Sequence, residues 1–501
     1  MELIGHLQLG FAAAAGAQNL LACFTGALLG TLIGVLPGLG PVATIALLLP
    51  LTYGLPPLTA LIMLAGIYYG AQYGGSTTSI LLNLPGEASS VVTCRDGHPL
   101  AKQGRAGTAL AVAALGSFFA GCVGTLFLAA CAPLLMRFAL DFGPAEYCSL
   151  MLFGLSGAVA IASRSLLKSL AMVVLGLLLG LIGTDANSGV ARYTFGLREL
   201  DDGVGTTVLA VGVFGFAELL HGLEHACRRT PAMRPCGRLW PDRADTRRAV
   251  PAVLRGTALG TLLGLLPGAG ALLPAFASYA LEKACARDPA RFGQGAIEGV
   301  AGPESANNAA AQTAFIPMLT LGIPSNAIMA LMIGALTLHD IQPGPQVIVH
   351  DPVLFWGLVA SMWIGNAMLL VLNLPLIGLW VRLLATPYRL LYPAILLFCC
   401  LGLYALANRT GDLYLAALFG LLGYLLQKSG CETVPLLLGF VLGPLFEEHL
   451  RRALLLARGD ASVFLQRPLS LALLLAALAL ILGALSPTAR RARRQLATEP
   501  G

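Results

Sequence analysis

Charged residues are scarce in this chain. Lysine, arginine, aspartate and glutamate make up 11% of its 501 residues, against about 25% in an ordinary soluble domain. Hydrophobic residues reach 57%, whereas a single soluble core stops growing near about 250–300 residues. One soluble core could not bury this much apolar surface, so the scarcity of charge indicates a membrane protein.

Two chemical motifs are also missing. No Gly-Lys dipeptide occurs, which excludes the G-x-x-x-x-G-K-[ST] loop that binds ATP phosphates. The eleven cysteines include no C-x-x-C pair, so we expect small buried hydrophobic residues rather than a disulfide framework. We therefore expect no enzyme, no cofactor and no nucleic-acid partner, and a process driven by an ion gradient or by a partner protein.

The apolar segments set the fold class. A helix needs about 20 apolar residues to cross roughly 30 Å of hydrocarbon, so this chain has room for about a dozen crossings. We predict an all-α polytopic membrane protein in a lipid bilayer. Residues 1–20 contain no Lys or Arg ahead of their apolar run, and we interpret them as the start of the first span rather than a cleaved signal.

An arginine-rich break divides the chain almost in half. Residues 224–250 contain seven arginines and three acidic residues, which marks a cytoplasmic loop by the positive-inside rule. Residues 1–223 are predicted to form a first transmembrane repeat and 251–450 a second. Residues 451–501 are predicted to hold a linker, a last span and a basic tail. Arginines flank that span on both sides, so one cluster must break the rule.

An internal repeat supports this division. Gly30-Thr-Leu-Ile-Gly-Val-Leu-Pro-Gly-Leu-Gly40 recurs as Gly260-Thr-Leu-Leu-Gly-Leu-Leu-Pro-Gly-Ala-Gly270, at an offset of 230, with eight of eleven positions identical. A weaker pair, 82–85 and 321–324, has an offset of 239. Shared Thr, Pro and Gly positions make a chance match a poor explanation of the first pair.

Basic residues indicate that the repeats have opposite orientations. Residues 53–57 contain no Lys or Arg, but their counterpart at 283–291 contains three. Conversely, residues 94–105 contain three, and their counterpart at 333–344 contains none. Because Lys and Arg favour the cytoplasm, we predict two inverted repeats. This plan builds alternating-access transporters with the substrate site at the repeat interface.

The repeated Leu-Pro-Gly-x-Gly segments interrupt apolar runs. Proline removes a backbone donor and glycine frees the chain to unwind, and in lipid such a break survives only inside protein or beside a wet cavity. We predict broken or re-entrant helices beside a binding site; a tight turn between ordinary spans is the alternative. The candidate residues here are Pro37, Gly38, Gly40, Pro267, Gly268 and Gly270.

Two other segments gather polar side chains between apolar runs. Their hydroxyl and amide groups suit a carboxylate and hard cations such as Na⁺, although hydroxyls can also join helices at roughly 0.6 kcal/mol each. The candidate residues are Ser76, Thr77, Thr78, Ser79, Asn83, Glu304, Ser305, Asn307, Asn308 and Asn326. Glu304 could bind Na⁺ or carry a proton. Glu87 and Asp185 are lesser candidates, and helix capping is the interpretation we favour for both.

Neither polar segment contains Lys or Arg; the nearest are Arg95 and Arg291. An anion would then be held by neutral donors, helix N-termini and co-bound cations. Residues 221–225 offer an enzymatic alternative, because His221, Glu224 and His225 match the H-x-x-E-H pattern of a zinc hydrolase. A third ligand is not evident there. A channel is the other alternative.

Two stretches closely resemble one transporter family. The first is Gly30–Gly121, with Gly34-Val-Leu-Pro-Gly-Leu-Gly-Pro41, Gly66-Ile-Tyr-Tyr-Gly-Ala-Gln-Tyr-Gly-Gly-Ser-Thr-Thr-Ser-Ile-Leu-Leu-Asn-Leu-Pro-Gly-Glu-Ala-Ser89 and Gly104-Arg-Ala-Gly107. The second is Gly299–Ser325, with Pro303-Glu-Ser-Ala-Asn-Asn308. Both resemble the large membrane subunit of the tripartite tricarboxylate transporters, the TctA family.

The resemblance implies a permease in the bacterial inner membrane. Its expected partners are a small membrane subunit and a periplasmic solute-binding protein that delivers an organic carboxylate, whether a tricarboxylate, a dicarboxylate or an aromatic acid. Family members resemble secondary importers that use Na⁺ or H⁺ as the coupling ion.

Overall fold

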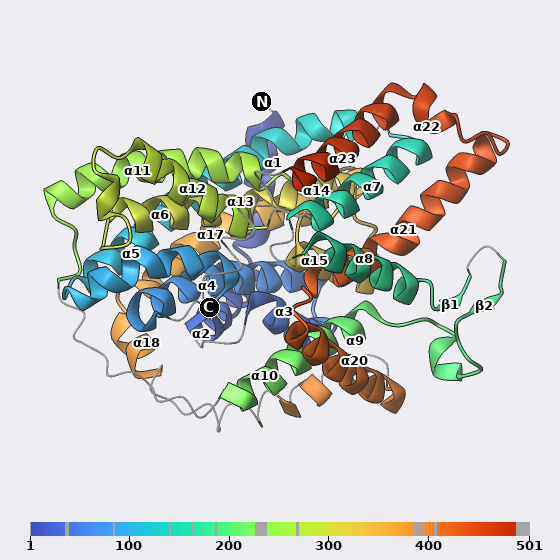
Figure 1. Ribbon diagram of the computed structural model, residues 1–501, viewed down its shortest axis with the longest axis horizontal. Helices are drawn as coiled ribbons and strands as arrows, with labels where there is room; N and C mark the ends of the chain where they lie inside the picture. The colour runs from blue at the N-terminus through green and yellow to red at the C-terminus, as the bar shows by residue number, and fades with distance from the viewer. Residues whose placement is uncertain are drawn as a thin grey trace.

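The computed structural model is almost entirely helical (Figure 1). It describes residues 2–35, 40–83, 86–139, 142–161, 165–185, 188–225, 238–266, 270–383, 393, 396–397, 399–401, 403–404 and 408–486. Its one sheet joins β1 (Gly183–Thr184) to β2 (Ala191–Arg192) in an antiparallel hairpin. The prediction of an all-α chain is therefore confirmed for these residues, apart from this hairpin.

The helices before the arginine-rich break are α1 (Glu2–Ala14), α2 (Ala17–Val35), α3 (Pro41–Thr52), α4 (Pro57–Leu82), η1 (Ala88–Ser90), α5 (Val91–Lys102), α6 (Ala106–Ala139), α7 (Pro144–Ile161), α8 (Leu166–Gly180), η2 (Arg198–Leu200), α9 (Thr206–Ala210), η3 (Val211–Phe216) and α10 (Ala217–His225). Those after it are α11 (Arg243–Leu263), α12 (Leu272–Cys285), η4 (Pro289–Arg291), α13 (Glu298–Thr313), α14 (Phe315–Leu321), α15 (Ala327–Leu338), α16 (Pro345–His350), α17 (Pro352–Asn373), α18 (Ile377–Leu383), α20 (Thr410–Lys428), α21 (Val434–Leu456), α22 (Val463–Gln466) and α23 (Pro468–Leu485).

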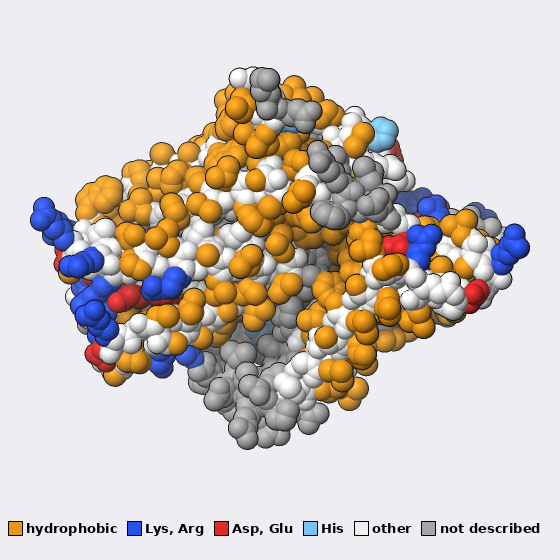
Figure 2. Space-filling view, turned by 90° about the horizontal axis from the view of Figure 1, so that it is seen from above, with side chains coloured by type: hydrophobic (Ala, Val, Ile, Leu, Met, Phe, Trp, Pro, Cys, Tyr) orange, Lys and Arg blue, Asp and Glu red, His pale blue; other side chains and the backbone are white. Residues whose placement is uncertain are grey.

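Four described helices, α2, α6, α17 and α23, are long and apolar enough to cross a membrane. Figure 2 shows hydrophobic side chains across the middle of one face and Lys and Arg near its two ends. The chain is thus a multi-pass membrane protein. Helices α3 and α15 have only 12 residues, about 18 Å, and α4 carries a polar segment inside the protein. A dozen crossings stays a prediction.

Both predicted helix interruptions are present. Helix α2 ends at Val35 and α3 begins at Pro41, while α11 ends at Leu263 and α12 begins at Leu272. Helices α3 and α12 have 12 and 14 residues, about 18–21 Å, which is shorter than the roughly 30 Å hydrocarbon core; re-entrant helices and a turn between two spans both stay predictions. Pro37, Gly38, Pro267 and Gly268 lie outside the described residues.

Glycines bring α2 and α4 into backbone contact. A Cβ atom added at Gly26, Gly30 or Gly34 would lie 2.2–2.4 Å from the carbonyl oxygen of Met63, Ile67 or Ala71 respectively. The residue numbers on α2 and α4 increase together along these three contacts, so the two helices run parallel. Small residues spaced four apart allow such close approach in membrane helices.

The second half repeats this contact between α11 and α13. A Cβ atom added at Gly256 or Gly260 would lie 2.3 or 2.1 Å from the carbonyl oxygen of Gly302 or Ala306. Gly256 and Gly260 follow Gly26 and Gly30 by the repeat offset of 230. The sequence repeat therefore corresponds to a repeated helix contact.

Helix α4 also has a counterpart, formed by α13 and α14. Helix α4 ends before Asn83 (φ 58°) and α14 before Gly322 (φ 71°); the two left-handed residues are 239 positions apart, the offset of the weaker sequence repeat. The helices meet in opposite directions. Ser76 contacts Glu304, whereas Tyr69, earlier in the chain, contacts the ring of Phe315, later in the chain.

The two basic loops lie close to each other, and so do the two loops without Lys or Arg. The Gln103 side chain donates to the carbonyl oxygen of Gln294 at 2.8 Å, which joins the end of one basic loop to the connection that follows the other. At the other pair, Tyr53 stacks on His339 with ring centroids 6.4 Å apart. The two loops without Lys or Arg are therefore in contact as well.

Three of the four arginines at 451–467 form ion pairs with acidic residues. Their ion pairs are Arg451 with Asp185 and Glu447, Arg452 with Glu448, and Arg467 with Glu146. Figure 1 places α22 and the β1–β2 hairpin at one end of the molecule, and α5 and α11 at the other. Pairing offsets the positive charge of 451–467. The basic tail at 487–501 lies outside the described residues.

The N-terminus differs from the prediction of one continuous first span. Helix α1 ends at Ala14 and α2 begins at Ala17. Helix α1 packs on α17, because Gly10 lets the backbone of Trp356 approach and the His6 ring stacks on the Trp356 ring at 5.2 Å. A turn at Ala15 and Gly16 thus separates α1 from α2.

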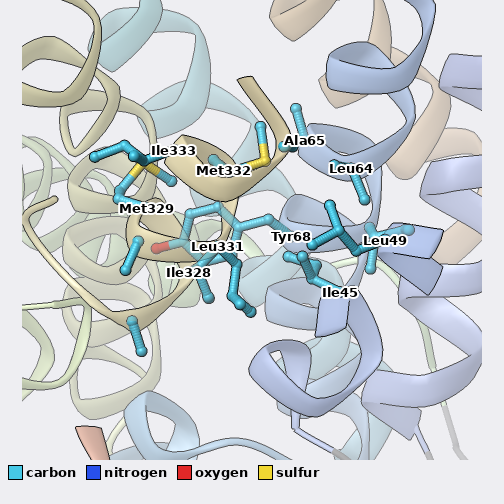
Figure 3. Packing of buried hydrophobic residues seen from close by; sticks show 14 of the residues in the cluster. Ile45, Leu49, Leu64, Ala65, Tyr68, Ile328, Met329, Leu331, Met332 and Ile333 are labelled. Atoms are coloured by element: carbon cyan, nitrogen blue, oxygen red, sulfur yellow. The ribbon is translucent and has the colours of Figure 1, made fainter. Parts of the chain in front are cut away.

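A large apolar cluster joins α3, α4 and α15 (Figure 3). Its labelled side chains are Ile45, Leu49, Leu64, Ala65, Tyr68, Ile328, Met329, Leu331, Met332 and Ile333. Among the described cysteines, Cys23, Cys148 and Cys399 are buried, as expected, but Cys285 is exposed. All described cysteines are free thiols.

Candidate binding site

The carboxylate of Glu304 joins helices from both halves. Glu304 lies on α13 and is 1% exposed. Ser76 of α4 donates a hydrogen bond to Oε2 at 2.5 Å, and Thr93 of α5 donates to Oε1. Each carboxylate oxygen therefore accepts a hydroxyl from the opposite half of the chain.

The next turn of α13 extends this polar contact toward α6. Asn308 Nδ2 donates to Ser117 Oγ at 2.8 Å and to the carbonyl oxygen of Glu304 at 3.0 Å. Asn307 is fully buried, and neither of its amide atoms has a hydrogen-bond partner in the described part of the chain. An unpaired buried amide costs about 1–3 kcal/mol, so Asn307 is a candidate ligand-binding group.

Glu87 belongs to the same site, contrary to the predicted capping role. It is buried, its carboxylate accepts a hydrogen bond from the Ser89 hydroxyl, and it lies near Glu304 and near Asn307, whose amide atoms do not meet hydrogen-bond geometry with it. A Cβ atom at Gly75 would lie 3.0 Å from Glu87 Cγ, so the glycine makes room for this side chain. We call Ser76, Glu87, Thr93, Ser117, Glu304, Asn307 and Asn308 the polar cluster.

No Lys or Arg forms an ion pair with Glu87 or Glu304 in the described part of the chain. The nearest predicted cations are engaged elsewhere. The Arg95 guanidinium lies over the Tyr279 ring at 5.9 Å, and Arg291 pairs with Glu298 at 3.1 Å. Neither polar segment contains Lys or Arg, and among the described residues none reaches Glu87 or Glu304 from elsewhere to form an ion pair.

The other predicted residues of α4 and α13 serve helix packing. Thr78 donates to the carbonyl oxygen of Val35 at 2.7 Å, at the end of α2. Ser79 donates to Ser90 Oγ at 2.9 Å, which joins α4 to η1. Ser305 donates within α13, to the Ala301 carbonyl oxygen. Asn83 is exposed and outside the polar cluster.

The second helix break forms a separate site with Asn326. Gly270 has a φ of 54°, and a Cβ atom there would contact Asn326 at 3.8 Å. Asn326 caps α15 by accepting the Met329 N–H at 2.9 Å and interacts with the Tyr68 hydroxyl. Gly40 precedes α3 with an extended backbone. These residues are not brought to Glu304 by any described hydrogen bond.

A small pocket lies beside the polar cluster. It is lined by Tyr73, Ser76, Thr77, Leu110, Ala113, Ala114, Ser117 and Asn373, and it has room for about one water molecule. The Tyr73 hydroxyl and Asn373 Oδ1 are buried without a hydrogen-bond partner in the described part of the chain. Ligand pockets usually have about 300–1,000 Å³, so this pocket is too small for a ligand of ordinary size.

Sequence reasoning gave Glu87 only as a lesser candidate, with helix capping preferred, and did not single out Thr93 or Ser117. Thr93 lies on a helix that the charge pattern marked as a basic loop, and Ser117 lies within an apolar run. Their contacts cross 211 and 191 positions of sequence. Asp185 is also no helix cap, because its carboxylate pairs with Arg192 and Arg451 at 3.6 and 3.0 Å.

The zinc-hydrolase alternative gains no support from the structure. The Glu224 carboxylate pairs with Lys428 at 3.0 Å and accepts the Tyr424 hydroxyl at 2.8 Å. Across the described residues, no group of three or more His, Cys, Asp and Glu side chains could hold a metal ion.

Comparisons with known proteins cover nearly the whole chain. A protein from Agrobacterium vitis, named an uncharacterized 52.8 kDa protein in the TAR-I ttuC' 3' region, is 56% identical over 499 residues, which are 100% of this chain and 99% of that protein. An uncharacterized protein in the TAR-II ttuC' 3' region of the same organism is 58% identical over 240 residues, 48% of this chain and 99% of its own length. No solved structure matches.

The family comparison agrees with the resemblance seen in the motifs. The sequence model of the Tripartite tricarboxylate transporter TctA family matches residues 20–438. This range includes both helix breaks, the polar cluster and all the helices from α3 to α20. The chain therefore belongs to the TctA family and is a membrane component of a tripartite tricarboxylate transporter.

Proposed function

We propose that this chain is the permease subunit of a secondary transporter that imports an organic carboxylate across the bacterial inner membrane. A small membrane subunit and a periplasmic solute-binding protein are the proposed partners, and Na⁺ or H⁺ is the proposed coupling ion. The observation that carries the proposal is the polar cluster. It holds two buried carboxylates, amides and hydroxyls between the two halves, without a described Lys or Arg partner.

Neutral donors alone cannot drive import of an anion into a cell that is negative inside. Each elementary charge that crosses 100 mV involves roughly 2.3 kcal/mol, so a trianion faces about 7 kcal/mol. Three co-transported monovalent cations would neutralise a trianion, and two would neutralise a dianion. Buried carboxylates give such cations a place to bind.

Inverted repeats are part of the proposal. The opposite directions of α4 and α13–α14 support them, as do the contact of the two basic loops and the contact of the two loops without Lys or Arg. Labelling of single cysteines in intact cells tests this topology. Leu55→Cys should react with an impermeant maleimide from outside, and Cys285, which is exposed, only after the membrane is opened. Labelling of both from one side would refute the inverted arrangement.

Uptake measurements test the function itself. Cells that express the chain with its neighbouring subunits should accumulate a labelled tricarboxylate, dicarboxylate or aromatic acid against its gradient, which a channel cannot do. Asn308→Ala should abolish uptake while membrane insertion persists. Ser149→Ala is the matched control, because Ser149 makes its buried hydroxyl contact with Ser470, between α7 and α23. Equal uptake by both variants would overturn the site.

A further inference from the structure

Seven carboxylates are buried among the described residues: Glu87, Asp96, Glu146, Asp185, Asp245, Glu282 and Glu304. Four of them have an arginine partner, namely Glu146, Asp185, Asp245 and Glu282. Asp96 instead accepts three backbone N–H groups, from Gly293, Gly295 and Ala296. Glu87 and Glu304 have neither form of compensation within the described chain.

The hydrogen bonds of these two carboxylates favour their ionised forms, whereas their burial favours protonation, so both can be ionised only if a positive charge compensates for the burial. Both oxygens of Glu304 accept hydroxyl protons, from Ser76 and Thr93, and Glu87 accepts one from Ser89. Donation to a carboxylate stabilises the charged state. Two adjacent buried negative charges are costly unless a positive charge lies near them.

Unpaired oxygen ligands lie beside the two carboxylates. Asn307 is fully buried next to Glu87, and its amide oxygen has no hydrogen-bond partner among the described residues. The Tyr73 hydroxyl also has no hydrogen-bond partner among the described residues, and Tyr73 lines the small pocket together with Ser76, which donates to Glu304. Hard cations prefer such oxygen ligands.

We propose that Na⁺ binds between Glu87 and Glu304, with the Asn307 amide oxygen as a neutral ligand. This inference rests on the proposed function and makes Na⁺, rather than H⁺, the coupling ion. Because Glu87 belongs to the first half and Glu304 and Asn307 to the second, the cation would join the two halves across their interface. Binding would thus stabilise one arrangement of the halves.

Thermal unfolding of the purified full-length chain tests the site without any carboxylate. At constant ionic strength, NaCl should raise the unfolding temperature relative to choline chloride, and KCl should not. Glu87→Gln, Glu304→Gln and Asn307→Ala should each raise the half-saturating Na⁺ concentration by about tenfold or more, the usual loss when a metal site is altered. Glu448→Gln, a surface glutamate paired with Arg452, is the matched control.

The wild-type chain alone can overturn the proposal. If NaCl and choline chloride give the same unfolding temperature, or if CaCl₂ stabilises the chain where NaCl does not, no Na⁺ site exists as described. Unchanged half-saturation in the three variants would overturn the residue assignment. Neither result bears on carboxylate uptake, which a proton gradient could still drive, so failure of this site is distinct from failure of the proposed function.

Discussion

Two turns of the chain occupy corresponding places and differ in chemistry. The turn before α5 holds Glu87, which interacts with Asn307 of α13. The turn before α15 holds Asn326, which interacts with Tyr68 of α4. Asn307 and Tyr68 are 239 positions apart, the repeat offset, so each half contributes a turn to the long helix of the other. One such contact is charged and the other is neutral.

The helices that follow these turns differ in the same way. Helices α5 and α15 both have 12 residues, and each lies after a left-handed residue, Asn83 at the end of α4 or Gly322 at the end of α14. The third and sixth residues are Thr93 and Asp96 in α5, but Met329 and Met332 in α15. Helix α5 therefore adds to the polar cluster, whereas α15 packs in the apolar cluster of Figure 3. The two helices thus occupy similar places in the fold, but α5 has polar side chains where α15 has methionines.

The largest expected effect falls equally on both halves. Gly30→Leu and Gly260→Leu each place a side chain against a carbonyl oxygen, at 2.3 Å for Ile67 and 2.1 Å for Ala306. Overpacking against backbone should cost more than about 3 kcal/mol, so neither variant should yield a monodisperse peak in fluorescence-detected size exclusion. Gly378→Ala is the control, since nothing lies near a Cβ atom at that position. If one of the two leucine variants gave a monodisperse peak and the other did not, the two helix contacts would not be equivalent.

A smaller loss of stability is expected from a change at Asp96, the sixth residue of α5, where α15 has the uncharged Met332. Asp96→Ala removes the acceptor of three backbone N–H groups and of the Tyr279 hydroxyl. Leaving these donors unpaired should cost about 3 kcal/mol, measured by thermal unfolding in detergent. Tyr279→Phe should cost about 1 kcal/mol, because it removes one of the four hydrogen bonds. Equal losses would show that the backbone N–H groups find other partners.

Thr93→Val tests whether the hydroxyl at the third residue of α5 contributes to the site, in contrast to Met329 at the third residue of α15. The change keeps the shape of the side chain but removes the hydroxyl that donates to Glu304. Loss of one hydrogen bond to a charged group, about 1.5 kcal/mol, should slow carboxylate uptake about tenfold and leave the size-exclusion profile unchanged. Thr93→Ser should restore most of the uptake. Full activity of the valine variant would remove Thr93 from the site.

The smallest effect is expected at the third residue of α15. Met329 is fully buried in the apolar cluster, and Met329→Leu roughly conserves volume, so the loss of stability should stay below about 1.5 kcal/mol. Uptake by the same cells should equal that of the wild type. A loss as large as that of Thr93→Val would mean that α15 takes part in binding as directly as α5.

Sequence reasoning reached the elements that local chemistry determines. The helix breaks follow from Pro and Gly, and the loop contacts agree with the distribution of Lys and Arg. Glu304 was found because a carboxylate in an apolar run is costly. The partners of Glu304 were not, since hydroxyls such as Thr93 acquire a role only when helices far apart in sequence meet. Similarly, the turn at Ala15 and Gly16 that separates α1 from α2 was not predicted, since small apolar residues continue on both sides of it.

The glycine contacts of α2 with α4 and of α11 with α13 have a mechanical consequence. Where backbone touches backbone, no side-chain rotamer can change to let one helix slide along the other. Each helix pair should therefore move as a rigid body. The compliant surfaces are those where flexible side chains meet, above all the methionines of α15 against α3 and α4. If the transporter opens and closes, the helices should move relative to one another at the interface of α15 with α3 and α4.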